Sequence, residues 1–124
     1  MEVPILKQGE YLIASIQAAL SDSDLKQLRD ELSGRVGRLR CRGVIVDVTV
    51  LDVIDSFTSR TLRDIAYITR MRGAETVIAG IQPEAAIAMV ELGMTMEGMF
   101  TVLDLEEGLA LLDSISVRHG QRHA

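Results

Sequence analysis

Apolar and polar positions repeat with two different periods in the first third of this 124-residue chain. Residues 3–7 and 11–17 are short apolar runs separated by the turn residues 8–10, which predicts a β-hairpin. A Ser-Asp start then predicts a helix over residues 21–36. Its apolar positions follow helical spacing and form one stripe: Leu25, Leu28, Leu32 and Val36.

The rest of the chain predicts strands that alternate with helices. The β-branched runs 43–50, 76–80 and 99–104 indicate buried strands. A helix stripe follows each run, and it consists of Leu62, Ile65, Ala66 and Ile68 or Thr69 in the first case. The second helix starts at Pro83 and runs to Gly93, since proline suits the first turn. The third carries Leu105, Leu109, Leu112 and Ile115, with Asp104 and Glu107 as a predicted capping box.

The predicted order is ββαβαβαβα, which defines an α/β fold class. Strands alternating with helices imply right-handed crossovers and parallel pairing, and the first hairpin adds an antiparallel strand. We therefore expect a mixed, mainly parallel β-sheet with an N-terminal hairpin and with helices mostly on one face. Residues 1–116 form a single expected domain, and residues 117–124 form a flexible polar tail.

Composition narrows the class of protein. The chain is 48% hydrophobic and 25% charged, its net charge is −5, and its longest apolar run falls far short of a bilayer span. Cys41 is the single cysteine and cannot form an internal disulfide, which favours a cytoplasmic location. Aromatic residues make up 3%, too few for a base-stacking surface. Four arginines gather at residues 35–42, where an anion site is conceivable but solvated charges at a helix end are the favoured interpretation.

Catalytic motifs are missing from the sequence. The two histidines, His119 and His123, lie in the polar tail, and neither a nucleophile elbow nor a phosphate-binding glycine loop occurs. Metal binding by the histidine pair is a weaker interpretation than a solvated tail. Cys41 has arginine neighbours that favour a lowered thiol pKa, although a structural thiol at a strand start is the preferred interpretation. We expect no enzyme activity, no cofactor and no metal.

The segment DVIDSFTSRTL at residues 52–62 holds several hydroxyls between acidic residues and a helical stripe. Asp55 or Ser56 is expected to cap the helix. A helix start after the carboxyl end of a parallel strand is also where open sheets expose functional groups. A phosphoryl group on Ser56 would be tolerated by the helix amides, and it would add about −1.5 to −2 charge.

Such a modification is expected to change what this surface binds rather than to melt the fold. Asp52 and Asp55 already make the patch acidic, and a partner that docks on the bare helix start would meet the added charge, its bulk and a desolvation cost. Arg60 and Arg63, about one and two turns on, would soften the repulsion within the chain. With Phe57, these residues make up the predicted switch surface around Ser56.

The chain resembles the STAS domains of anti-sigma-factor antagonists, and within them the RsbS-like scaffold branch of the bacterial stressosome. The motifs that carry the resemblance are VIDSF at 53–57, GIQPEAA at 80–86 and ELGM at 91–94. Weaker support comes from PILK at 4–7, SIQ at 15–17 and GVIVDVT at 43–49. The match spans nearly the whole chain in the right order, and the ββαβαβαβα pattern agrees with the STAS fold.

This resemblance implies a non-catalytic scaffold in which Ser56 is the phosphorylation acceptor. The unmodified protein would hold an RsbT-like serine kinase in a complex with RsbR-like co-antagonists. Phosphorylation of Ser56 would release the kinase, and an RsbX-like phosphatase would reset the scaffold. The kinase would bring ATP and magnesium, and the output would be a stress or sigma-factor pathway.

One departure from the family pattern bears on the acceptor. Simpler antagonists have a small residue and a glycine after the serine, whereas Phe57 and Thr58 stand here, which favours the RsbS-like branch. Thr58, Ser59 and Thr61 add hydroxyls that related scaffolds often lack, so Thr58 and Ser59 are secondary candidate acceptors.

Two alternatives remain open at this point. One is a STAS module that binds a small ligand or a nucleotide, or that belongs to an anion transporter. The other is a receiver-like domain phosphorylated on Asp47 or Asp52, because a carboxylate that ends a central strand invites the comparison. Receivers also need an acidic pair after the first strand and a late lysine, but Lys26 is the last lysine of the chain.

Overall fold

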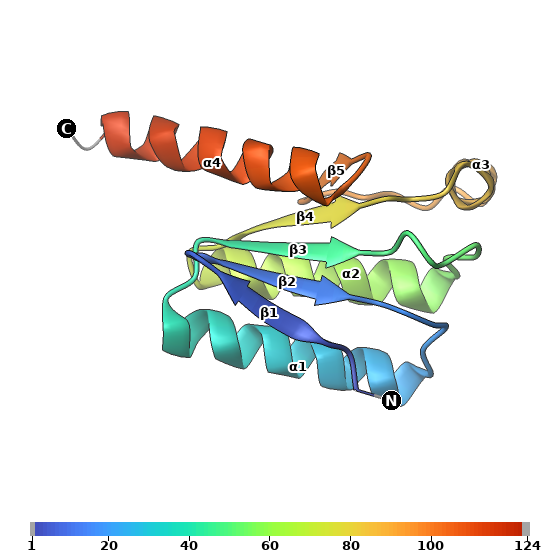
Figure 1. Cartoon of the computed structure of the whole chain (residues 1–124). Helices are drawn as coiled ribbons and strands as arrows, with labels where there is room; N and C mark the ends of the chain where they lie inside the picture. Colours follow the sequence, from blue (N-terminus) through green and yellow to red (C-terminus); the bar gives the residue numbers. More distant parts are fainter. Residues whose placement is uncertain (1, 123–124) are drawn as a thin grey trace.

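The computed structural model describes residues 2–122, and its elements follow the predicted order ββαβαβαβα (Figure 1). Their bounds are β1 Ile5–Gln8, β2 Tyr11–Ser15, α1 Asp22–Leu39, β3 Gly43–Asp47, α2 Ser56–Met71, β4 Glu75–Ala79, α3 Pro83–Glu91, β5 Phe100–Val102 and α4 Leu105–Arg122. The burial of the apolar side chains of α1 confirms the predicted stripe, which consists of Leu25, Leu28, Leu32 and Val36.

The strands form one sheet in the order β1-β2-β3-β4-β5. β1 pairs antiparallel with β2 through the hairpin turn, in which Gly9 adopts a positive φ of 60°. The remaining neighbours are parallel, and a helix connects each of these pairs. The mixed, mainly parallel sheet with an N-terminal hairpin is therefore confirmed.

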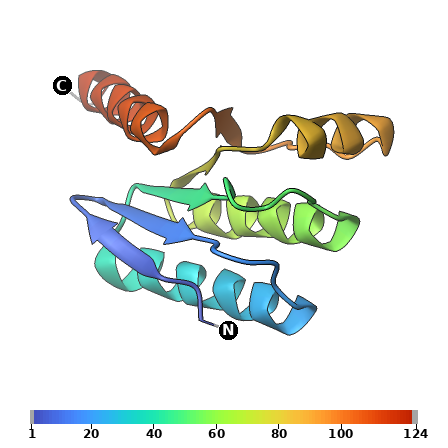
Figure 2. The same cartoon turned by 45° about the vertical axis from the view of Figure 1, so that its right-hand side comes forward.

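Alternate residues of the strands build two separate clusters, one on each face of the sheet. Leu12 and Val44 face the larger cluster, whereas Ile13 and Ile45 face the smaller one. α1 and α2 lie side by side on the first face, while α4 covers the opposite face (Figures 1 and 2). Buried residues of α3 join the first cluster, so most helices contribute to one face, as predicted.

Close packing and one hydrogen bond fix α4 on its face of the sheet. A Cβ added at Gly108 would lie 3.2 Å from Cδ1 of Ile45, so the helix backbone approaches the strand closely. The Tyr11 hydroxyl donates to Oδ1 of Asp113 at 2.6 Å. The pKa of Tyr11 is raised, mainly by burial and secondly by this hydrogen bond. The hydroxyl therefore keeps its proton and remains a donor.

Two predicted element ends that differ from the structure illustrate the role of local contacts. β3 ends at Asp47 rather than at residue 50, because Oδ1 of Asp47 accepts from the backbone and hydroxyl of Thr49 and forms a turn. α1 continues past Gly37 to Leu39, and the Arg72 guanidinium occupies the space that a side chain at Gly37 would fill. The helix then ends at Arg40, whose φ is 52°.

The start of α4 also differs from its prediction in one bond. Asp104 caps the helix, accepting from the backbone of Glu107 at 2.9 Å. In the predicted capping box, the Glu107 side chain would accept from the backbone N–H of Asp104. Its Oε2 accepts instead from the backbone N–H of Leu103, at 2.8 Å. α4 extends to Arg122 and so overlaps the predicted tail 117–124; residues 123–124 lie outside the described residues, and the tail's flexibility stays a prediction.

Candidate functional site

The loop that joins β3 to α2 carries the hydroxyl cluster to the carboxyl end of the parallel strands. Asp55 is the N-cap of α2, and its Oδ1 accepts from the backbone N–H of Thr58 at 2.7 Å. Ser56 is the first helical residue. Of the two residues predicted as the cap, Asp55 is therefore the N-cap. The Ser56 hydroxyl does not cap the helix.

The electrostatics of this cap favour a negative charge. The hydrogen bond from the Thr58 backbone holds the pKa of Asp55 below its ordinary value, and the charge of Arg60 adds to the effect. Asp55 is therefore ionised at neutral pH. The same free amides that stabilise this carboxylate would stabilise other anionic groups at the helix start.

The side chains of the hydroxyl cluster differ sharply in exposure. Ser56 is exposed, whereas Thr58 is 9% exposed and Ser59 is 2% exposed. The Thr61 hydroxyl is turned inward and donates to the carbonyl of Phe57 at 2.9 Å. Of the three candidate acceptors, only Ser56 is accessible to another protein in the folded chain.

The predicted switch-surface neighbours surround Ser56 on two sides. Asp52 and Asp55 are exposed before it in the loop. Arg60 and Arg63 follow at the i+4 and i+7 positions of α2, so they share one helix face with Ser56. Phe57 is half-buried, and the ammonium group of Lys26 in α1 lies 5.9 Å from its ring centre.

Three residues that the sequence did not single out hold the loop in place. The Gln82 side chain, just before α3, donates to the Thr49 carbonyl at 2.6 Å. Gly80 follows β4 with φ of 81°, and a Cβ there would overlap the Thr49 side chain. Their sequence signals are two runs that carry the family resemblance: GIQPEAA at 80–86 holds Gly80 and Gln82, and GVIVDVT at 43–49 ends at Thr49.

Apolar side chains also lie at this end of the molecule. Val50 and Val53 in the loop are 58% and 70% exposed. Val53 borders a cavity of about 130 Å³, which Asp55 and Thr58 line as well. Exposed apolar side chains next to charged ones are typical of protein–protein contact surfaces.

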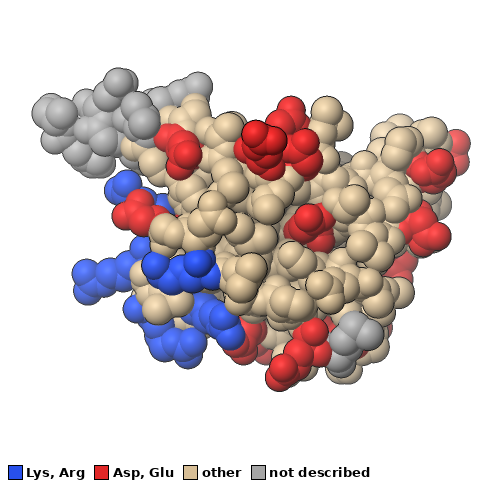
Figure 3. All heavy atoms as spheres, in the orientation of Figure 1, with Lys and Arg blue, Asp and Glu red and all other residues tan. Residues whose placement is uncertain are grey.

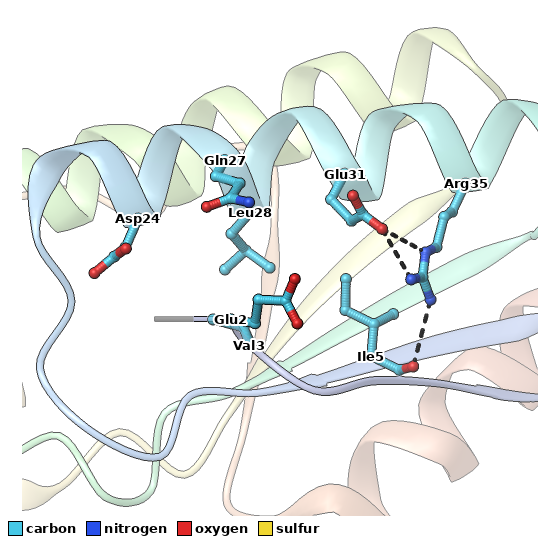
Figure 4. A pocket seen from close by; sticks show the side chains of 8 residues that line it. All are labelled: Glu2, Val3, Ile5, Asp24, Gln27, Leu28, Glu31 and Arg35. Carbon is cyan, nitrogen blue, oxygen red and sulfur yellow. Dashed lines mark hydrogen bonds and ion pairs between the residues drawn. The ribbon is translucent and has the colours of Figure 1, made fainter.

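A second cavity, of about 100 Å³, lies away from Ser56 between the N-terminal segment and α1 (Figure 4). Glu31 pairs with Arg35 at 2.8 Å, and the Arg35 guanidinium also donates to the Ile5 carbonyl at 3.4 Å (Figure 4). These bonds fasten the edge strand β1 onto α1. Glu31 and Arg35, two of the polar residues that line this cavity, therefore serve the fold.

The arginines of residues 35–42 occupy the opposite end of the molecule from Ser56. Arg38, Arg40 and Arg42 are exposed around the end of α1, and basic side chains gather at this end of the face shown in Figure 3. Their neighbour Cys41 is 3% exposed. Burial raises the pKa of its thiol, which agrees with the preferred interpretation of Cys41 as a structural thiol and not with its activation by Arg40 and Arg42.

We expect replacement of Asp55 by alanine to lower the free energy of unfolding by about 1 kcal/mol at neutral pH, because the cap bond is lost. Since the folded-state pKa is lowered, this stabilisation is present above the ordinary value of 3.8 and is lost as pH falls through the folded-state pKa. Urea unfolding of the natural chain and of the Asp55→Ala variant, at pH 7 and near pH 3, measures the difference in their free energies of unfolding. Asp55→Asn is the control that caps without titrating, and an unchanged difference at both pH values would contradict the prediction.

Comparison with known proteins identifies the family. Residues 2–107 match the STAS domain family. The chain belongs to the STAS domain family. The strand order β1-β2-β3-β4-β5 also differs from the 2-1-3-4-5 order of receiver domains, which removes the fold argument for the receiver-like alternative.

Individual relatives support the more specific resemblance. RsbS of Moorella thermoacetica, solved as a Ser-to-Glu variant, is 33% identical with a TM-score of 0.81, and the alignment covers 94% of this chain and 98% of that one. A chain of a solved stressosome is 34% identical with a TM-score of 0.77, covering 91% and 98%. The RsbT co-antagonist protein RsbRA of Bacillus subtilis is 29% identical over 88% of this STAS chain, which spans 40% of that protein.

Within residues 2–122, no helix has both the length and the apolar content that a membrane crossing requires. The described residues also hold no group of three or more metal-binding side chains of His, Cys, Asp or Glu. The predicted histidine pair falls partly outside them, since His123 is not described.

Proposed function

We propose that this STAS domain is a phospho-switched scaffold of the RsbS-like kind and itself performs no catalysis. In its unmodified form it sequesters an RsbT-like serine kinase, and phosphorylation of Ser56 releases that kinase. The observation that carries the proposal is the selective exposure of Ser56. Its hydroxyl is accessible at the first turn of α2, while Thr58 and Ser59 are buried behind it.

The switch works through charge at a contact surface. The exposed Val50 and Val53 supply apolar area for docking, and Asp52 and Asp55 give the same surface a negative charge. A phosphoryl group on Ser56 would add about −1.5 to −2 charge to it. A partner bound there would meet added charge, added bulk and a desolvation cost, whereas the helix start itself would tolerate the charge.

The proposed partners follow from the relatives. The similarity to RsbS and to a stressosome chain supports assembly into a large complex with RsbR-like STAS co-antagonists. An RsbX-like phosphatase would reset the switch, and the complex would regulate a stress or sigma-factor pathway. The kinase would supply ATP and magnesium, so this chain would need no cofactor of its own, and the complex would act in the cytoplasm.

Phosphorylation mapping tests the proposal directly. We expect incubation with the RsbT-like kinase of the same organism and ATP to place one phosphoryl group on Ser56, as located by mass spectrometry. A Ser56→Ala variant should lose the label, while Thr58→Val, which keeps the buried shape, should retain it. An acid-labile label on Asp47 or Asp52, or undiminished labelling of Ser56→Ala, would contradict the phospho-switch.

A further inference from the structure

A groove of about 350 Å³ between α1 and α2 is lined by basic side chains. α1 contributes Lys26 and Arg29, and α2 contributes Arg60 and Arg63. The two α2 arginines lie on the helix face that begins with Ser56, so the groove runs along α2 away from that residue. We call it the α1–α2 groove.

The positive charges of the α1–α2 groove are poorly neutralised. Among the described residues, Lys26 and Arg60 form no ion pair. Arg63 donates one long hydrogen bond, of 3.4 Å to the Thr95 hydroxyl, and its Nε is buried without a partner in residues 2–122. Arg29 is bound to Asp30 at 3.1 Å outside the groove lining.

The carboxylates in the groove cancel only part of this charge. Asp64 and Glu97 line it, but neither forms an ion pair with any residue that the structure describes. Since Arg29 is paired with Asp30, three cations without an ion pair among the described residues face two carboxylates, on a chain whose overall net charge is −5. This local excess would attract acidic groups to the groove.

The shape of the groove fits an extended peptide better than a small anion. Phe57 and Tyr67 line it ten residues apart on α2, a separation of about 15 Å along the helix. An extended chain covers this length with about four to five residues. Aromatic side chains at both ends also offer apolar surface that an inorganic anion would leave unused.

We propose that the α1–α2 groove binds an acidic segment of a partner protein, about four to five residues long and extended. Its carboxylates pair with Lys26, Arg60 and Arg63, and an aromatic or aliphatic side chain of the segment packs on Phe57 or Tyr67. The inference goes beyond the phospho-switch, since it requires neither a modified Ser56 nor a kinase. Its failure and that of the phospho-switch are therefore separate results.

The test measures binding of a fluorescein-labelled peptide, Glu-Glu-Tyr-Glu-Glu-Glu, to the full chain by fluorescence anisotropy. We expect saturable binding that weakens as salt rises. The double variant Lys26→Gln/Arg60→Gln should lower the affinity about tenfold or more, because two charge-assisted contacts are lost. The double variant Arg38→Gln/Arg42→Gln is the matched control, since it removes the same charge at the opposite end, and it should lower the affinity by less than about twofold.

A second measurement keeps the inference testable if the groove variant is unstable. Titrating the peptide into the isotope-labelled natural chain should shift backbone amide NMR signals of α1 and α2 that face the groove. An equal loss of affinity in both double variants would show attraction by overall charge alone and overturn the proposal. So would displacement of the peptide by an equimolar amount of inorganic phosphate, or the absence of binding.

Discussion

Replacing Gly80 with alanine is expected to lower the free energy of unfolding by about 2–5 kcal/mol, from overpacking and a left-handed backbone together. Gly80 follows β4 with a φ of 81°, where a side chain is strained. An added Cβ would also lie 3.2 Å from the Thr49 Cα and would overlap the Thr49 side chain. Relief of that overlap requires movement of the backbone of the loop that leads to Ser56.

Urea unfolding and thermal melting measure the effect, and Gly93→Ala is the matched control. Gly93 has a similar φ of 70°, but an added Cβ would meet nothing within 4 Å, so this variant isolates the backbone strain at about 1–2 kcal/mol. The Gly80 variant should also weaken the bond from Gln82 to the Thr49 carbonyl, and NMR would report the change at both residues. Equal destabilisation by the two variants would show that the contact with Thr49 costs nothing.

Features that depend on neighbouring residues were predictable from the sequence. The buried stripe of α1 follows from its apolar spacing, and the alternation within β2 and β3 follows from the pleat of a strand. The cap of α2 lies within three residues of the group that it binds, so a run of acidic and hydroxyl residues was enough to indicate it.

Features that depend on distant residues were not predictable in this way. The hydrogen bond that supports the loop before α2 joins the Thr49 carbonyl to the side chain of Gln82, which lies 33 positions later. The α1–α2 groove joins Lys26 to Phe57, and no local pattern relates these two residues. Cys41 shows the same limit, because its arginine neighbours in the sequence are exposed while the folded chain buries the thiol between them.

The burial of Thr58 and Ser59 was predictable only in part, because it depends on both local spacing and distant packing. Both follow Ser56 closely, and their hydroxyls alone do not distinguish them from Ser56 as phosphorylation acceptors. Their burial depends on which face of α2 packs on the sheet and on α1. The stripe of Leu62, Ile65 and Ala66 defines that face, and Thr58 lies one turn before Leu62 on it. The helix stripe thus held the signal that separates Ser56 from its neighbours.

Replacing Ser56 with aspartate is expected to weaken capture of the RsbT-like kinase about tenfold or more, while the fold stays intact. The new carboxylate lies beside the exposed Asp52 and Asp55 at the proposed contact surface, and docking would remove it from water without a partner charge, which costs several kcal/mol. The fold should tolerate it because Ser56 is exposed at the first position of α2, where the helix dipole favours negative charge. This prediction rests on the proposed phospho-switch.

Kinase binding to immobilised Ser56→Asp, measured by biolayer interferometry, tests the expectation, with circular dichroism and melting as the check on the fold. Ser56→Asn is the matched control, since it has nearly the same size as aspartate without the charge, and it should retain most of the affinity. An equal loss in both variants would make steric bulk, and not charge, the cause of release. Unfolding of the aspartate variant alone would refute a switch that acts only at the surface, because the charge would then act through the fold.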